Sequence, residues 1–287
     1  MTYLLAIGSA LFYGAADFSG GLATRRAGAI AVVLLSQASG LVLLALILPF
    51  LAHASPSRGD LLWGAVAGLT GGIGVALLYR ALAIGTMAVV APTTAVCAVT
   101  IPVVVSVLLG ERPLPLAIAG IVLGFVSILL VSRLAAAQTH SHHPAAARRL
   151  PAGVGTAFAS GVAIGFFLLS LAQTGPGAGM WPLIVARLFS VTLFGAVAVV
   201  GARSVRMPAP VVALAIGGGI MDMLANALYM LAARQGPLSL VVTLSSLYPA
   251  STVLLARVVL GERLNAWQMS GVGCALAAIV LIVSGAR

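Results

Sequence analysis

The chain has 287 residues, of which 61% are hydrophobic and only 7% are charged, whereas soluble domains carry about 25% charged residues. With a mean hydropathy of +1.18, the solvent around most of the chain must be lipid, so the composition excludes a water-soluble globule. The formal net charge of +10 comes from Arg residues placed singly or in pairs between apolar runs. This pattern is typical of a membrane topology signal and argues against a nucleic-acid partner.

Apolar runs bounded by Gly, Pro, Arg or polar clusters predict ten membrane-spanning helices. These are expected at residues 3–22, 29–51, 60–84, 87–109, 114–132, 152–171, 179–201, 209–233, 238–260 and 265–284. The first run has no positively charged segment before it and contains an acidic residue, so we interpret it as a retained helix and not as a signal peptide. Cys97 and Cys274 lie inside apolar runs, where we expect them to pack and not to form a disulfide.

The chain divides into two similar halves. Residues 133–151 form the only long polar stretch, a linker between a first half at 1–132 and a second half at 152–287. Shifted by 151 residues, the halves match at Leu109–Arg112 and Leu260–Arg263, which both read LGER. The same shift places Ser9 on Ser160, Gly14 on Gly165 and Gly120 on Gly271. Because each half has five spans, we predict an all-α membrane protein with ten transmembrane helices in two inverted five-helix repeats.

Both halves carry the same arrangement of motifs around the fourth span. That span ends in LGER and is followed at once by a Gly-bearing fifth span, LPLAIAGIVLG in the first half and LNAWQMSGVGC in the second. Tyr-containing runs precede it, LLYRALAIG and ALYMLAARQG, and the second half adds LYP at Leu247–Pro249. In these features the sequence resembles the EamA group of the drug/metabolite transporter superfamily. The resemblance implies a ten-helix carrier that works by alternating access and usually exports small metabolites, amino acids or drug-like compounds.

The acidic residues are few and fall into two groups. Asp60, Glu111 and Glu262 lie at expected helix ends, and the Glu of each LGER turn can accept backbone N–H bonds at the start of the following helix. Asp17 and Asp222 instead fall well inside apolar spans, where a charged carboxylate costs about 2.5 to 3.5 kcal/mol. Each of these two carboxylates therefore needs a partner or a cavity.

Asp222 heads a polar stripe in the span at 209–233. Asn226 and Tyr229 follow it by four and seven residues, so the three side chains lie on one face of the helix, lining either a central cavity or a buried hydrogen-bond network. Arg187 is the only basic residue near the middle of a span, and we expect it to pair with Asp222 or with a substrate carboxylate. With the tyrosines of the Tyr-containing motifs, the candidate substrate-binding residues are Asp222, Asn226, Tyr229, Arg187, Tyr79 and Tyr248.

Asp17 is the candidate coupling residue. It lies within two turns of Arg25 and Arg26, so a structural ion pair or a solvated helix end would explain it. The functional interpretation is a protonatable site at which proton uptake and cation binding compete. Small multidrug-resistance proteins of the same superfamily use a first-helix carboxylate in this way, and the resemblance implies that role for Asp17.

Two further patterns concern helix shape and packing. Pro92, Pro102 and Pro249 each remove an intrahelical hydrogen bond, which permits a kink or a broken segment near the midplane. Small-residue spacings such as Gly64 with Gly68 allow helices to approach closely, either within the chain or in a homodimer.

The sequence carries no catalytic motif, and we expect neither an enzyme nor a cofactor. We predict a secondary active transporter in the cytoplasmic (inner) membrane that moves a small-molecule substrate, an organic metabolite, across the lipid bilayer in the direction of export. A divalent-metal or cation transporter using Asp17, Asp222 and the linker residues His140, His142 and His143 is the alternative. A membrane-embedded scaffold is a third hypothesis.

The orientation of the termini is left open by two conflicting signals. Ten Arg residues fall at the membrane face opposite the termini and four at the face that holds them, so the positive-inside rule places both termini outside. The family resemblance implies the opposite orientation.

Overall fold

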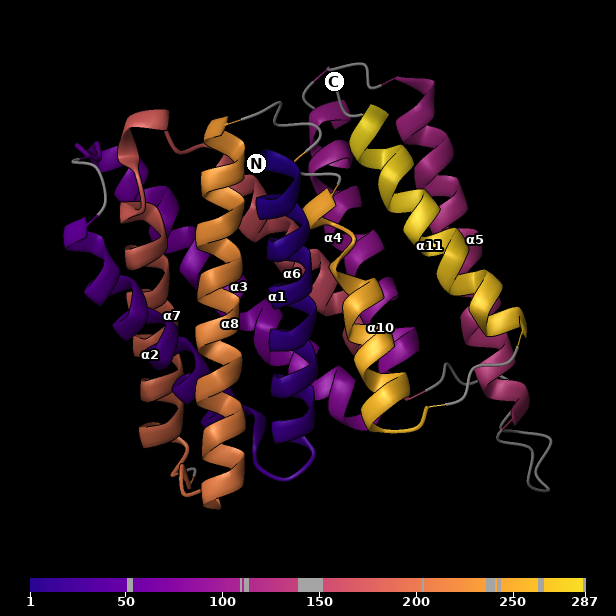
Figure 1. Ribbon diagram of the computed structural model, residues 1–287, viewed down its shortest axis with the longest axis horizontal. Coiled ribbons are helices and arrows are strands. Elements are labelled where there is room, and N and C mark those ends of the chain that lie inside the picture. The colour runs from indigo at the N-terminus through magenta and orange to yellow at the C-terminus, as the bar shows by residue number, and fades with distance from the viewer. Residues whose placement is uncertain are drawn as a thin grey trace.

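The structure, a computed structural model, describes residues 1–50, 54–108, 110, 114–138, 152–202, 204–235, 241, 244–262 and 266–285. All regular elements of these residues are helices (Figure 1). The α-helices are α1 (Thr2–Thr24), α2 (Ala29–Ile47), α3 (Arg58–Ile84), α4 (Met87–Leu108), α5 (Pro115–Gln138), α6 (Val154–Ala172), α7 (Trp181–Val200), α8 (Ala209–Gln235), α10 (Tyr248–Val259) and α11 (Ala266–Gly285). Two short 3₁₀ helices are η1 (Leu48–Phe50) and η3 (Pro176–Ala178).

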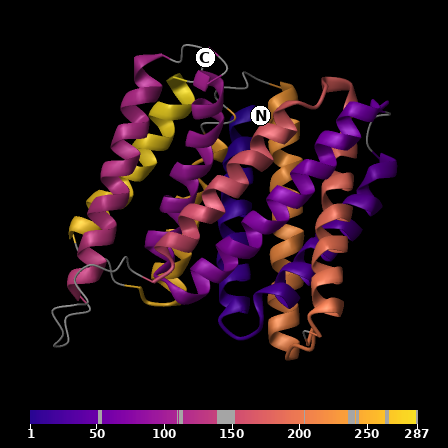
Figure 2. The same ribbon diagram turned by 180° about the vertical axis from the view of Figure 1, so that it is seen from behind.

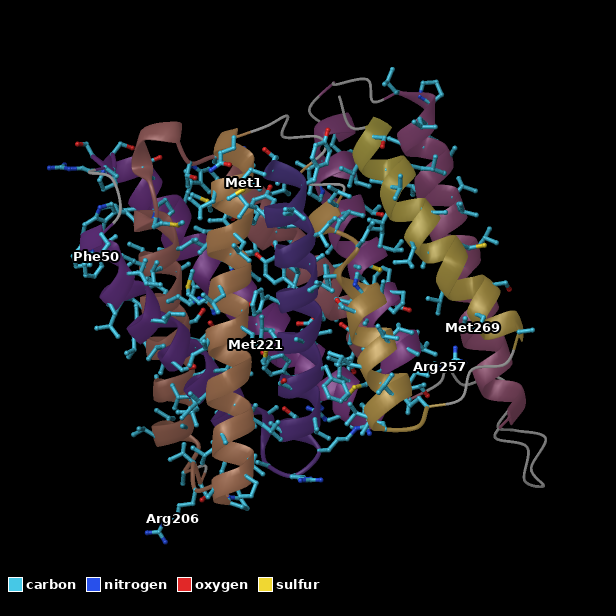
Figure 3. All side chains as sticks on the ribbon, in the orientation of Figure 1. Met1, Phe50, Arg206, Met221, Arg257 and Met269 are labelled. Carbon is cyan, nitrogen blue, oxygen red and sulfur yellow. The ribbon has the colours of Figure 1, made fainter. Side chains whose placement is uncertain are left out.

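The helices lie side by side in one bundle that suits a bilayer. Both termini lie at one face, which we call face A, and Arg206 and Arg257 lie at the opposite face, face B (Figures 1, 2 and 3). Within the described residues, α2 with η1, α3, α6, α7 and α8 are long and apolar enough to cross a membrane by length and composition. The chain is therefore a multi-pass membrane protein in which backbone polar groups are satisfied inside the helices.

Glycine brings the backbones of α3 and α7 close together. A Cβ on Gly68 would lie 2.3 Å from the carbonyl oxygen of Ala186, and one on Gly64 would lie 2.8 Å from that of Pro182. Ser190 of α7 also donates to the Gly68 carbonyl over 2.6 Å. The small-residue spacing predicted from the sequence thus serves packing within the chain.

Hydrogen bonds between helices recur in the two halves. The Ser9 hydroxyl of α1 donates to the carbonyl of Ala225 in α8 over 2.9 Å, and Ser160 of α6 donates to the carbonyl of Gly74 in α3 over 2.7 Å. The shift of 151 residues that relates Ser9 to Ser160 also relates Gly74 to Ala225. The contact of α1 with α8 is thus equivalent to the contact of α6 with α3.

A second pair of bonds follows the same shift. Thr94 of α4 donates to the carbonyl of Ala157 in α6 over 3.2 Å, and Ser245 donates to the carbonyl of Ala6 in α1 over 3.4 Å.

The glycines of the two LGER motifs share a backbone conformation. Gly110 and Gly261 both have positive φ, +92° and +66°. Only glycine adopts this conformation at little cost, and it ends a helix.

The span expected at 238–260 is not one continuous helix. Among its described residues, Ser246 and Leu247 form a turn, and α10 begins at Tyr248 with Pro249 in its first turn. Proline suits that position because its ring would clash with the carbonyl four residues earlier in a continuing helix. Pro92 and Pro102, by contrast, lie within α4.

The other helix ends lie close to their predicted positions, apart from that of α5. This helix runs to Gln138, six residues beyond the expected end at residue 132. Its last residues include Ala135–Ala137, and alanine has the highest intrinsic helix propensity. The first part of the expected linker 133–151 is therefore helical.

The α3–α7 contact predicts a large cost for one added methyl group. Gly68→Ala should lower the melting temperature of the detergent-solubilised protein by several degrees, equivalent to about 1–3 kcal/mol, because the methyl group meets backbone that cannot move aside. Gly195→Ala in α7 is the matched control, since a Cβ there meets nothing within 4 Å. Equal effects of the two substitutions on the melting temperature would contradict this view of the packing.

Candidate functional site

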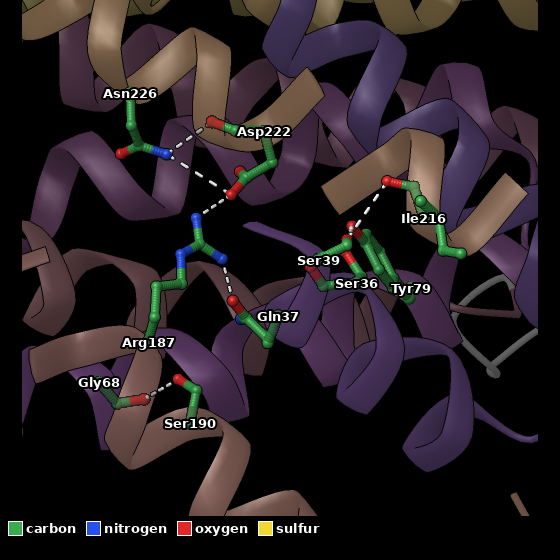
Figure 4. Close-up of polar contacts among 10 residues, drawn as sticks. All are labelled: Ser36, Gln37, Ser39, Gly68, Tyr79, Arg187, Ser190, Ile216, Asp222 and Asn226. Carbon is green, nitrogen blue, oxygen red and sulfur yellow. Dashed lines mark hydrogen bonds and ion pairs between the residues drawn. The ribbon is translucent and has the colours of Figure 1, made fainter. Parts of the chain in front are cut away.

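A buried arginine lies at the centre of the polar residues inside the bundle. Arg187 of α7 is 9% exposed. Its guanidinium pairs with the carboxylate of Asp222 in α8 and donates to the side-chain oxygen of Gln37 in α2 (Figure 4). One cation thus holds three helices together, as expected for a charge that must be neutralised in an apolar interior.

Asp222 is the central residue of α8, so the ion pair lies at mid-depth. Asn226 donates from its side-chain nitrogen to the backbone carbonyl of Asp222 over 2.7 Å and reaches the Asp222 carboxylate at 3.5 Å (Figure 4). Of the two arrangements that the polar stripe allowed, the described contacts are those of a buried hydrogen-bond network. Asp222 nevertheless keeps 19% of its side-chain surface exposed.

Asp17 lies in the same region of the bundle but is not neutralised in the same way. It is half-buried on α1 beside a contact between α1 and α8, where a Cβ on Gly218, one turn before Asp222, would lie 3.5 Å from the carbonyl oxygen of Ala16. Within the described residues its side chain makes no hydrogen bond or ion pair. Arg25, a partner considered from the sequence, pairs instead with Glu262. Asp17 is therefore a carboxylate inside the bundle with no cationic partner among those residues.

Two tyrosines form an aromatic pair next to α1. The rings of Tyr13 and Tyr248 lie 6.1 Å apart and are tilted by 58°, and a Cβ on Gly14 would lie 2.6 Å from the carbonyl oxygen of Tyr248. Tyr13 was not singled out from the sequence, although its position four residues before Asp17 puts the two on one helix face. Aromatic rings beside a carboxylate offer a cationic group both an opposite charge and a π face.

The two other candidate tyrosines, Tyr79 and Tyr229, differ in burial. Tyr79 is 2% exposed, its hydroxyl lies 3.5 Å from that of Ser36, and a Cβ on Gly20 would overlap its ring. Tyr229 is half-buried and packs against the apolar cluster that contains Ala6. Tyr79 is thus a packing residue in this conformation, and Tyr229 lies beside the polar stripe.

The second LGER turn makes contacts that the sequence did not indicate. Glu262 accepts backbone N–H groups at a helix start, as expected, but these belong to Met87 and Ala88 of α4 in the other half, over 3.2 and 3.3 Å. Asp60, also expected at a helix end, forms a capping box with Ser57 at the start of α3 and accepts the Gly175 N–H over 2.7 Å. Glu111 of the first LGER lies outside the described residues.

Comparison with known proteins identifies the family. The model of the EamA-like transporter family matches residues 1–133 and 151–284, which together are nearly the whole chain. The chain belongs to the EamA-like transporter family. It is therefore a membrane transporter of the drug/metabolite type, and the resemblance noted in the sequence is confirmed.

Similarity to individual proteins is more distant. No curated protein matches this EamA-like transporter. A solved structure described only as "Crystal structure of protein" shares 18% sequence identity with it at a TM-score of 0.62, over 100% of this chain and 97% of the other. This likeness concerns the fold alone.

In this EamA-like transporter, the buried pair should show strong energetic coupling. Arg187→Gln or Asp222→Asn alone leaves an uncompensated charge, which we expect to cost about 3–5 kcal/mol of stability. The double variant should lose clearly less than the sum of the two. Thermal unfolding of the four proteins in detergent measures this cycle, and additive losses would mean that the pair does not determine the charge balance of the site.

Proposed function

We propose that this EamA-like transporter is a secondary active exporter that carries small organic metabolites, amino acids or drug-like compounds, across the cytoplasmic membrane by alternating access. The observation that carries the proposal is Asp17, a partly accessible carboxylate without a cationic partner in the described part of the bundle. Arg187, the buried cation of α7, is already held by Asp222 and Gln37. A positively charged group on the solute is the missing counter-charge.

The paired hydrogen bonds support two inverted five-helix repeats. The contacts of Ser9 and Thr94 with the opposite half have counterparts at Ser160 and Ser245 under one shift of the sequence. A bundle built in this way has two related packings of similar free energy, and rocking between them moves access from one face to the other. The ten-helix arrangement and alternating access belong together in the proposal.

Asp17 also supplies a way to couple transport to protons. A carboxylate enclosed by protein is costly when charged and unpaired, so it is stable either protonated or paired with a cation. Proton and cationic solute then exclude each other at one site, and uptake of a proton at one face drives release of the solute there. Tyr13 and Tyr248 would hold the apolar part of the solute next to the charge.

The alternative of a divalent-metal carrier has less support. No three His, Cys, Asp or Glu side chains converge within the residues that the structure describes. Asp222, the second carboxylate of that hypothesis, is occupied by Arg187, which repels a metal ion. The linker residues His140, His142 and His143 lie outside the described residues.

The first test is binding. The melting temperature of the purified protein should rise with organic cations or amino acids and not with divalent metals, since a ligand of the folded state adds RT ln(1 + [L]/Kd) to stability. A rise with metals alone would favour the alternative.

The second test is flux of the organic solute that raises the melting temperature most, measured in proteoliposomes with an imposed pH gradient. We expect Asp17→Asn to abolish pH-driven flux, because an amide neither pairs with a cation nor takes up a proton. Asp60→Asn removes a carboxylate from the cap of α3, away from the site, and should leave the flux at its wild-type level. Wild-type flux in the Asp17→Asn protein would refute the proposed role of Asp17.

A further inference from the structure

At face B, one carboxylate joins the ends of several helices. Glu262 follows α10 and accepts the N–H groups of Met87 and Ala88 at the start of α4 over 3.2 and 3.3 Å. The same carboxylate pairs with the guanidinium of Arg25, just after α1, at 3.4 Å. Arg25 in turn donates to the carbonyl of Leu82, near the end of α3, over 3.4 Å. The ends of α1, α3, α4 and α10 thus meet at one ion pair.

This cluster lies between the candidate site and face B. Arg25 follows Asp17 by about two turns of α1. Between them, Gly21 lets α1 approach α3 and α4 so closely that a Cβ there would lie 2.6 Å from Leu82 and 3.1 Å from Met87. Access from face B to Asp17 along α1 would have to separate these contacts.

The interactions at Glu262 are strong enough to bias a conformation but weak enough to break. The side chains of Arg25 and Glu262 are 30% and 15% exposed, so the pair is partly screened by water. A partly exposed ion pair of this kind is weak, and a carboxylate at a helix N-terminus adds a stabilisation of similar size. Contacts of this size suit a gate that must open in every transport cycle.

The repeat does not reproduce this ion pair at face A. The shift of 151 residues that relates the LGER motifs places Pro176 at the position of Arg25, and proline carries no charge. The sequence therefore supplies a cation at this position of the repeat at face B and none at the equivalent position at face A. An asymmetric contact of this kind favours the conformation that is closed at face B over its inverted counterpart.

We propose that Arg25 and Glu262 form the gate that closes face B, with the Glu of the second LGER as its positioning residue. The gate rests on the proposed alternating-access function. Opening at face B requires Glu262 to leave both Arg25 and the N-terminus of α4. The LGER turn then acts at a distance from the solute, which it never touches.

The test is a distance measurement across face B. Spin labels are attached to cysteines at Gly28, in the turn before α2, and at Val258, near the end of α10, in a Cys97→Ala/Cys274→Ala protein. A Cβ at Gly28 meets nothing within 4 Å and Val258 is 73% exposed, so both labels fit without disturbing the gate. Pulsed electron paramagnetic resonance then gives the distribution of distances between them in proteoliposomes.

We expect Arg25→Gln and Glu262→Gln to raise the ratio of long to short distances about two- to five-fold, as loss of a partly screened ion pair should. Arg26→Gln is the matched control. It removes the same charge from the neighbouring position, where the side chain is exposed, and it should leave the distribution of distances unchanged. Arg25→Lys keeps the positive charge and should also leave the distribution of distances unchanged. Identical distributions for Arg25→Gln and Arg26→Gln would overturn the gate.

The distance measurement needs no solute, so the two proposals can fail separately. Unchanged distances together with pH-driven flux would remove the gate and leave the transporter. A distance shift in the Arg25→Gln protein without flux of any solute would support the contact at face B and remove the proposed transport function.

Discussion

A permanent cation in an apolar bundle is the constraint on which the site depends. The guanidinium of Arg187 stays charged at any physiological pH, and burial without a counter-charge would cost several kcal/mol. Asp222 and Gln37 meet that requirement from α8 and α2, which fixes how α7 lies against both. Because Arg187 is neutralised within the bundle, we propose that the carboxylate of Asp17 is left for a partner from outside and that the solute therefore carries a positive charge.

Close backbone contact is the second requirement, since lipid gives helices no hydrophobic reason to associate. Gly68 meets α7 at backbone distance, and the hydroxyls of Ser9 and Ser160 donate to carbonyls of facing helices. The hydroxyl bonds recur in the two halves, whereas the shift of 151 residues places no proline at the position equivalent to Pro249 and no cation at the position equivalent to Arg25. The contacts that recur in both halves hold the bundle together, and those without an equivalent make its two faces differ.

Local patterns in the sequence predicted most of the helices, because spans are set by apolar length. For Arg187, the only basic residue near the middle of a span, they predicted either Asp222 or a substrate carboxylate as the partner, and the structure has the pair with Asp222. Tyr13 could have been found by its helical spacing from Asp17. The bond from Met87 to Glu262 could not, because it joins residues 175 positions apart. No local sequence pattern indicates which helix N-terminus a given carboxylate will contact. The break in the ninth span was also hidden, because a proline in an apolar run can lie inside a helix or begin one. Pro92 lies inside α4 and Pro249 lies in the first turn of α10, and only the structure distinguishes the two cases.

The central claim is that Asp17 and its tyrosines face the transported solute, and protection of a cysteine tests it most directly. Tyr13→Cys, in a protein without Cys97 and Cys274, is labelled with a membrane-impermeant maleimide with and without the organic solute that raises the melting temperature most. The account predicts that the solute slows labelling at position 13 and leaves labelling of a Gly28→Cys control unchanged. Equal labelling rates at position 13 with and without a solute that demonstrably binds would contradict it.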